Sequence, residues 1–172
     1  SLLYRFVPDR KQDLTSGKLY ALGVKDHKSA DLRNHQPQSK RVIEEGQQLA
    51  TYWIELDDPA SPRDDLRLRG FRQGAARFSR GEGIFYDKGA IYLCCTNGGP
   101  QKRGQVFRIL PHNDQRPESM VELFLEPRES DLLTSGDNLC VAPNGDLIIC
   151  EDLVDPFKKQ QLPHLRGVTP EG

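Results

Sequence analysis

Short apolar runs alternate with turns rich in glycine, proline and asparagine along almost the whole chain. The clearest examples are residues 84–96 and 139–152, in each of which two apolar runs flank a turn. The turns carry glycine at matching positions, Gly89 and Gly145, so the two stretches align at an offset of 56 residues (145 − 89 = 56). Self-similarity at such a period is typical of β-propellers and other repeat folds. The pattern therefore predicts that one strand–turn–strand unit is repeated.

Apolar runs of this length, bounded by turn residues, are typical of short β-strands. Four short strands in each repeat are typical of a propeller blade. We therefore predict an all-β fold of about three four-stranded antiparallel blades, of which the first and last are incomplete. The expected strands are residues 2–7, 18–24, 49–56, two strands in 84–96, 104–110, 120–125, two strands in 139–152, and 165–168.

Two stretches depart from the strand pattern. Residues 66–78 carry apolar side chains at three- and four-residue steps, which predicts one short helix. Residues 26–46 are rich in lysine, glutamine, asparagine and arginine, which predicts a long surface loop or a partly disordered one. We expect the two histidines of this stretch, His27 and His35, to be solvated.

Composition excludes some classes of function. Charged residues make up 28% of the 172 residues, but they nearly balance, with a net charge of −1. Nucleic-acid binding would need a clustered basic excess, so we expect no nucleic-acid partner. No apolar run approaches the ~20 residues of a membrane span, and no signal peptide is visible. Because the chain opens on an apolar strand and stops in a turn, we interpret residues 1–172 as a fragment of a single propeller domain, truncated at both ends.

The four cysteines all lie in apolar strands, and their spacing does not match a structural zinc site. We expect buried, reduced thiols. Pairing or metal contact stays open as an alternative, because Cys95 and Cys150 occupy near-equivalent places in the two repeats. The cysteines are Cys94, Cys95, Cys140 and Cys150.

Acidic and amide side chains cluster where the repeated strands begin and end. Glu82 lies between two glycines, Asp137 and Asn138 follow a glycine, and Glu151 and Asp152 close an apolar strand. Two adjacent carboxylates at the end of a buried strand are costly unless they are compensated. Calcium, which takes six to eight oxygen ligands, would compensate them. The alternative is that these side chains lie on a solvated rim and accept hydrogen bonds from loop amides.

The arginines near the repeat offer a second kind of chemistry. Arg80 precedes the first repeat, and four more arginines lie in the expected helix. Guanidinium groups suit phosphate because they can form two parallel hydrogen bonds, although a solvated basic face explains the helix arginines equally well. No nucleophile motif and no phosphate loop are present. Any hydrolysis would therefore be metal-assisted.

At this point the residues carry a family resemblance. Five motifs occur in order: residues 3–6 with 17–22, then 52–56, 75–82, 137–139 and 145–152. Together they resemble the PhoX-type alkaline phosphatase family. The resemblance implies a six-bladed β-propeller that hydrolyses phosphate monoesters, small-molecule substrates, with calcium and iron. It also implies export through the twin-arginine route to the periplasm or the outside of the cell.

The resemblance also implies roles for individual residues. The family usually reads Arg-Pro-Glu where this chain has Arg80, Gly81 and Glu82, and its glutamate is a metal ligand. Glu82 is therefore an expected metal ligand, with Asp137, Glu151 and Asp152, while Arg80 and Asn138 are expected to bind substrate. The family's iron-bound cysteine is expected upstream of this chain. A complete site needs further blades, so we expect the 172-residue piece to be inactive alone.

Two alternative functions stay open. Calcium-dependent lactonases of the gluconolactonase type also carry acids around one central calcium, and would present an apolar cleft. A non-catalytic propeller that binds a partner or polysaccharide would hold calcium only as a structural plug. Function belongs to the site and not to the fold, so the contents of the site must separate these alternatives. Two metals with arginines at the mouth would favour the phosphatase.

Overall fold

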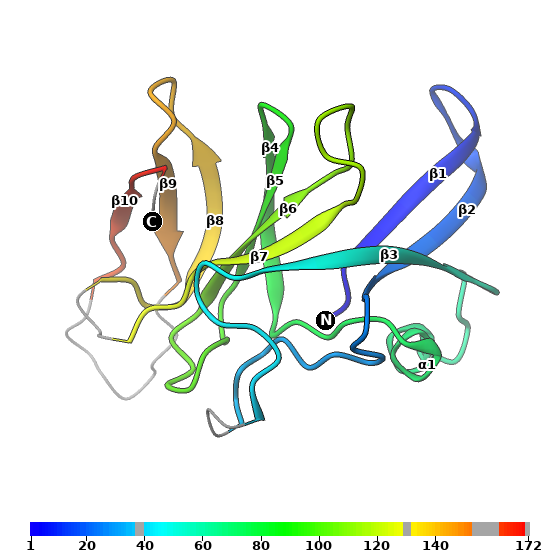
Figure 1. The fold of residues 1–172 in the computed structure, drawn as a ribbon, viewed down its shortest axis with the longest axis horizontal. Coiled ribbons are helices and arrows are strands. Elements are labelled where there is room, and N and C mark those ends of the chain that lie inside the picture. Colours follow the sequence, from blue (N-terminus) through cyan, green and yellow to red (C-terminus); the bar gives the residue numbers. More distant parts are fainter. Residues whose placement is uncertain (37–39, 129–131, 153–161, 171–172) are drawn as a thin grey trace.

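The computed structural model describes residues 1–36, 40–128, 132–152 and 162–170. These residues form ten β-strands and one short helix (Figure 1). The elements are β1 (Tyr4–Arg10), β2 (Asp13–Val24), β3 (Gln48–Leu56), α1 (Leu66–Gln73), β4 (Gly81–Asp87), β5 (Ala90–Cys95), β6 (Gln105–Leu110), β7 (Met120–Leu125), β8 (Gly136–Val141), β9 (Leu147–Glu151) and β10 (Leu165–Val168).

All strand pairs are antiparallel and fall into two sheets. The larger sheet has the order β1-β2-β3-β7-β6-β5-β4, and the smaller has the order β10-β9-β8. Strand β3 joins two groups: residues 51–56 pair with β2, whereas residues 48–50 pair with β7. The larger sheet therefore curls, and β1 and β2 stand apart from β4–β7, which β3 reaches at β7 (Figure 1). The predicted all-β class is confirmed, and the three antiparallel groups are consistent with a partial propeller.

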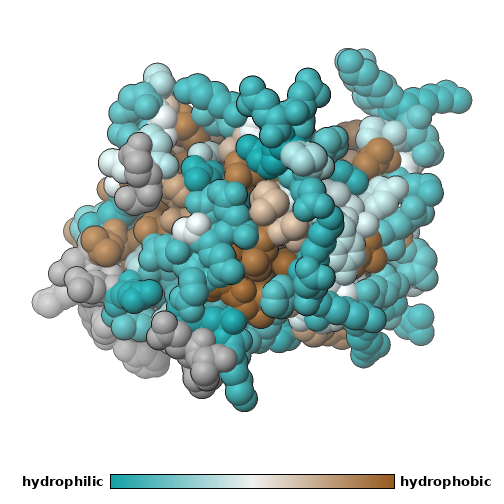
Figure 2. Space-filling view, viewed as in Figure 1, coloured by the Kyte–Doolittle hydropathy of each residue, from teal (hydrophilic) through white to brown (hydrophobic). Residues whose placement is uncertain are grey.

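In the middle group, β4–β7, strands β5–β7 are buried on both faces, whereas Ile84, Phe85 and Tyr86 of β4 are exposed. Successive side chains of a strand point to opposite faces, and on β5 Leu93 and Cys95 enter one apolar core while Cys94 enters the other. The first core includes Leu22 and Phe107, and the second joins the middle group to β8 and β9. Hydrophilic side chains cover most of the face seen in Figure 2, and apolar side chains show at its centre. The strand groups are therefore stacked face to face.

Residues 26–46 are not the surface excursion that their composition predicted. In the described part of this connection Leu32 and Ile43 are fully buried in the first core. The backbone is also tied down, because Leu32 N–H donates to Arg77 O and Gly99 N–H donates to Arg33 O. The connection therefore closes one end of the core beneath the middle group.

A buried polar network accounts for the polar composition of that connection. The carboxylate of Glu126, which is 2% exposed, accepts hydrogen bonds from Asn34 Nδ2 and Gln105 Nε2, both at 2.8 Å. Arg41 Nη1 lies 2.9 Å from the other carboxylate oxygen, Glu126 Oε1. Removing one partner of such a pair leaves a buried charge, at a cost of about 3–5 kcal/mol. Asn34 and Arg41 of this stretch are thus part of the core.

The helix is shorter than predicted. It ends at Gln73 because Gly74 adopts a φ of 122°, a left-handed conformation that glycine tolerates, and donates its N–H to Phe71 O. Phe71 and Leu66 pack on a third apolar cluster with Leu56. Among the described residues no helix is long and apolar enough to cross a membrane.

The cysteine prediction is right for one pair and wrong for the other. Cys94 and Cys95 are buried, and burial raises the pKa of both thiols, that of Cys95 to about 12. Cys140 and Cys150 are exposed, because they lie on the face of the small sheet that no described element covers. All four are free thiols.

Asp31 yields a test of how the 26–46 connection is held. Its carboxylate accepts hydrogen bonds from Arg33 and, at 2.7 Å, from Arg77 Nη2. Burial disfavours the ionised form, but the two guanidinium groups outweigh burial and lower the pKa of Asp31 to about 2. A carboxyl group whose folded pKa is depressed stabilises the fold above its unfolded pKa and loses that contribution as the pH falls through the folded value.

We predict that Asp31→Asn lowers the free energy of unfolding at pH 7 by about 1–2 kcal/mol. The difference from wild type should shrink as the pH falls from about 4 to about 2. Urea denaturation across this pH range measures both effects. The matched control is Asp114→Asn on the exposed β6–β7 loop, which should change stability by less than about 0.5 kcal/mol at any pH. A pH-independent loss in Asp31→Asn would contradict this account.

Candidate anion pocket

Four polar residues meet at one edge of the structure because of how the repeats are built. Arg80 immediately precedes β4 and Ser135 immediately precedes β8, while Thr96 follows β5 and Asp152 follows β9. Since β4 pairs with β5 and β8 with β9, the start of one strand lies beside the end of the next. The tight turns of the two hairpins lie at the opposite edge (Figure 1).

The same main-chain hydrogen bond closes both hairpins at this edge. Thr96 N–H donates to Arg80 O at 3.1 Å, and Asp152 N–H donates to Ser135 O at 2.8 Å. Each bond lies next to a bulge, which adds one residue on β4 after Gly81 and one on β8 after Gly136. Arg80 and Ser135 are thus equivalent positions, as are Thr96 and Asp152. The repeat predicted from sequence recurs in space, and it sets the four side chains at one level.

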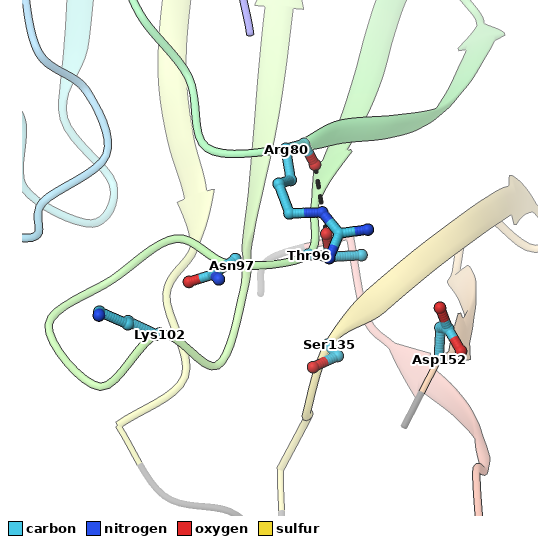
Figure 3. Close-up of a pocket in the computed structure, with 6 residues that line it drawn as sticks. All are labelled: Arg80, Thr96, Asn97, Lys102, Ser135 and Asp152. Carbon is cyan, nitrogen blue, oxygen red and sulfur yellow. Dashed lines mark hydrogen bonds between the residues drawn. The ribbon is translucent and has the colours of Figure 1, made fainter. Parts of the chain in front are cut away.

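These residues line a pocket of about 210 Å³ between the middle group and the small sheet. Figure 3 shows Arg80 and Thr96 from one repeat, and Ser135 and Asp152 from the next, with Asn97 beside them. Lys102 lines the pocket from the 96–104 loop, and its ammonium group points away from Asp152 in this view. The pocket thus combines a guanidinium, an amide, two hydroxyls and one carboxylate, and its donors suit the oxygens of an anion.

Arg80 is the main cationic group of this pocket. Its φ of 47° is unusual for a residue with a side chain, so the surrounding hydrogen bonds hold it in a left-handed conformation. Its nearest carboxylate oxygen is Glu82 Oε1, at 3.4 Å from Nη2, and the Arg80 side chain is 61% exposed. A single long contact leaves most of the five guanidinium donors available to a ligand.

The structure brings the two predicted acidic turns together. A side chain at Gly83 would lie 2.6 Å from both Asn138 Cα and Asp137 O, so β4 passes directly against β8. Glu82 and Asn138 are exposed and Asp137 is half-buried, so all three remain reachable from solvent. Asn138 Oδ1 accepts a hydrogen bond from Leu139 N–H at 2.9 Å.

Glu151 is instead enclosed by protein donors. Its oxygens accept hydrogen bonds from Arg166 Nε at 2.9 Å, from Thr134 N–H, and from the N–H and Nδ1 of His164. Burial opposes ionisation, but Arg166 and the other donors outweigh burial and lower the pKa of Glu151. This carboxylate ties β10 to the start of the small sheet. Its predicted role as a metal ligand stays a prediction, and in this conformation both oxygens are occupied.

Sequence reasoning missed several lining residues. Thr96 aligns with Asp152 at the sequence offset of 56 residues, so the repeat itself could have marked it. Ser135 matches Arg80 only at an offset of 55 residues, which the strand pairing reveals and the sequence alignment does not. Asn97 and Lys102 lie in a loop with no counterpart in the second repeat, so no signal marked them.

Ser79 and His35 lie beside the pocket without forming a nucleophile and base. Ser79 Oγ donates to Asn97 O at 2.7 Å, and His35 Nε2 lies 2.7 Å from the same carbonyl oxygen. A carbonyl oxygen only accepts, so His35 Nε2 carries the proton and is not a base for Ser79. The half-buried His35 is also not the solvated histidine that its sequence context predicted.

The family model for alkaline phosphatase PhoX matches residues 1–172, the whole chain. The chain belongs to the alkaline phosphatase PhoX family. No curated protein and no solved structure matches it. The predicted family is therefore confirmed, and with it a metal-dependent phosphatase class that acts on small-molecule phosphate esters.

The described residues of this PhoX chain do not by themselves fit a metal centre. Within residues 1–36, 40–128, 132–152 and 162–170, no group of three or more histidine, cysteine, aspartate or glutamate side chains lies close enough to hold a metal ion. Glu82 and Asp137 lie on neighbouring strands, but Glu82 contacts Arg80, and Asp152 belongs to the pocket. A metal centre would therefore need ligands from outside these ranges.

The approach of β4 to β8 gives a test of the geometry of this PhoX site. We predict that Gly83→Ala destabilises the fold by about 1–3 kcal/mol, because the added methyl group would meet backbone atoms that cannot move independently. Gly167→Ala is the matched control, since a methyl group there meets nothing within 4 Å. Thermal unfolding of both variants measures the difference. Equal melting temperatures would show that the two strands do not pack as described.

Proposed function

We propose that the protein carrying this chain hydrolyses phosphate monoesters with calcium and iron bound. The observation that carries the proposal is the family match, which extends over all 172 residues. Other residues of the site would have to come from outside the described ranges. The proposal concerns the whole protein, and we expect this stretch alone to be inactive.

The pocket supports a phosphate substrate. Arg80 offers a fork of donors, and the hydroxyls of Thr96 and Ser135 and the amide of Asn97 lie around the same space. Such donors are suited to the oxygens of a phosphoryl group. In this proposal Arg80 and Asn138 hold the substrate, and the donors of the pocket orient it.

Glu82 and Asp137 are the metal ligands that we propose from this chain. They lie on β4 and β8, two strands that touch at Gly83, and both are reachable from solvent. Carboxylate oxygens suit calcium. When bound, the metals would supply charge stabilisation and an activated oxygen nucleophile. Glu151 and Asp152 stay predicted ligands of lower rank, because one is enclosed by donors and the other faces the pocket.

We also propose that the protein is exported through the twin-arginine route to the periplasm or the cell exterior. The family resemblance alone supports this location. Fractionation of cells that express the natural protein, with and without a functional twin-arginine translocase, would test it.

Hydrolysis of p-nitrophenyl phosphate by the full natural protein, purified with its metals, tests the activity. We predict calcium-dependent turnover that a chelator abolishes, with iron found by elemental analysis. Glu82→Gln should lower kcat at least about tenfold and reduce the bound metal, because a neutral amide is a weaker ligand than a carboxylate. The matched control is Glu55→Gln. Glu55 is an exposed glutamate on β3 that pairs with Lys18 on β2, and its replacement should leave kcat and the bound metal unchanged.

One result would contradict the phosphatase proposal, and another would contradict only the role of Glu82. A protein that binds calcium alone and shows no turnover would redirect the search to lactone substrates, and then to binding partners. Full activity in Glu82→Gln would leave the phosphatase but remove the role given to Glu82.

A further inference from the structure

We propose that the pocket between the two repeats binds inorganic phosphate in a form that still carries a hydrogen, and that Asp152 selects this form against sulfate. The inference deepens the proposed function, on which its biological meaning rests, but its test needs binding alone. It also gives Asp152 a role other than that of a metal ligand.

Several hydrogen-bond donors line the pocket. Arg80 presents its guanidinium group with one long contact, to Glu82. Thr96 Oγ1 lies 3.4 Å from Arg80 O, at the limit of a hydrogen bond, and the Ser135 hydroxyl has no partner among the described residues. The pocket thus holds one hydroxyl without a partner, and a guanidinium and a second hydroxyl that each form one long contact. A group of such donors around one space is suited to a ligand with several acceptor oxygens.

The pocket also contains a carboxylate, that of Asp152. Asp152 is the one carboxylate among the six residues that line the pocket, and its side chain forms no hydrogen bond or ion pair with any described residue. A carboxylate only accepts, so it repels a ligand oxygen that carries no hydrogen and binds one that does. A hydroxyl of the ligand that donates to Asp152 would form a strong charge-assisted hydrogen bond.

The anions that could enter the pocket differ in whether they carry a hydrogen. Near neutral pH inorganic phosphate keeps at least one hydrogen, whereas sulfate keeps none and a phosphate monoester becomes a full dianion. The three anions present similar acceptor oxygens to Arg80, so only the contact with Asp152 separates them. A site built to receive a hydrogen bond rejects analogues that cannot supply it.

The size of the pocket suits a small anion. A volume of about 210 Å³ corresponds to roughly seven waters at ~30 Å³ each. A tetrahedral anion fits this space with part of its hydration shell retained. Arg80 and Asp152 line this space from different repeats, so we expect a ligand within it to contact both.

The consequence is a preference for product over substrate. Inorganic phosphate is what hydrolysis of a phosphate monoester releases, and it carries the hydrogen that the ester dianion lacks. The pocket would therefore retain phosphate in competition with the ester. In this view Asp152 determines specificity and is not a catalytic residue.

Isothermal titration calorimetry on the full natural protein, stripped of metals with a chelator, tests the proposal at pH 8. The probes are sodium phosphate and sodium sulfate. We expect wild type to bind phosphate at least about tenfold more tightly than sulfate. Asp152→Asn, whose amide can donate, should bind the two anions within about threefold of each other. Arg80→Gln should lose at least about tenfold in affinity for both.

Asp146→Asn, in the β8–β9 turn and away from the pocket, is the matched control and should bind like wild type. Circular dichroism of each protein verifies that it is folded. If chelation unfolds the protein, the phosphate and sulfate comparison is repeated on metal-loaded wild type and Asp152→Asn. Equal affinities for the two anions in wild type, or unchanged selectivity in Asp152→Asn, would overturn the proposal. Selective binding without turnover of the metal-loaded protein would instead remove only the proposed function.

Discussion

The structure depends on one constraint: the central strands β5–β7 carry buried apolar side chains on both faces. Each face removes apolar surface from water only if another layer covers it. The first layer is β1–β3 with the 26–46 connection, and the second is the small sheet. Stacking in this way brings the beginnings of β4 and β8 to one edge, so the pocket is a consequence of how the layers cover each other.

The strands could be predicted because their signal is local. An apolar run bounded by turn residues indicates a strand wherever it lies in the fold, and all ten strands expected from sequence correspond to strands of the structure. The connection at residues 26–46 could not be predicted in this way. Its asparagine and arginine are polar by composition, yet Asn34 and Arg41 are the partners of Glu126, about ninety residues away. No local pattern reveals a polar partner at such a separation.

The site was predictable to the same extent. Arg80 and Asp152 were found because they flank the repeated strands, and Asp137 because it follows a glycine turn. Thr96 and Ser135 carry no distinctive chemistry by themselves, and only pairing of the strands gives them a shared space. Glu151 differs from Asp152, since its carboxylate points back into the fold toward Arg166, and its role as a metal ligand stays a prediction. Neighbours in sequence on a strand face opposite sides.

The two main-chain hydrogen bonds that close the hairpins have an evolutionary consequence. Backbone groups at residues 80, 96, 135 and 152 hold the pocket in place, so the exposed or half-buried side chains of Arg80, Ser135 and Asp152 contribute little to the fold that supports them. Natural variation can therefore exchange the charge or size of these three side chains while the hairpins keep their register. Related chains could diverge in the anion they prefer without a matching loss of stability, and the repeat would offer several such positions for new specificities to arise.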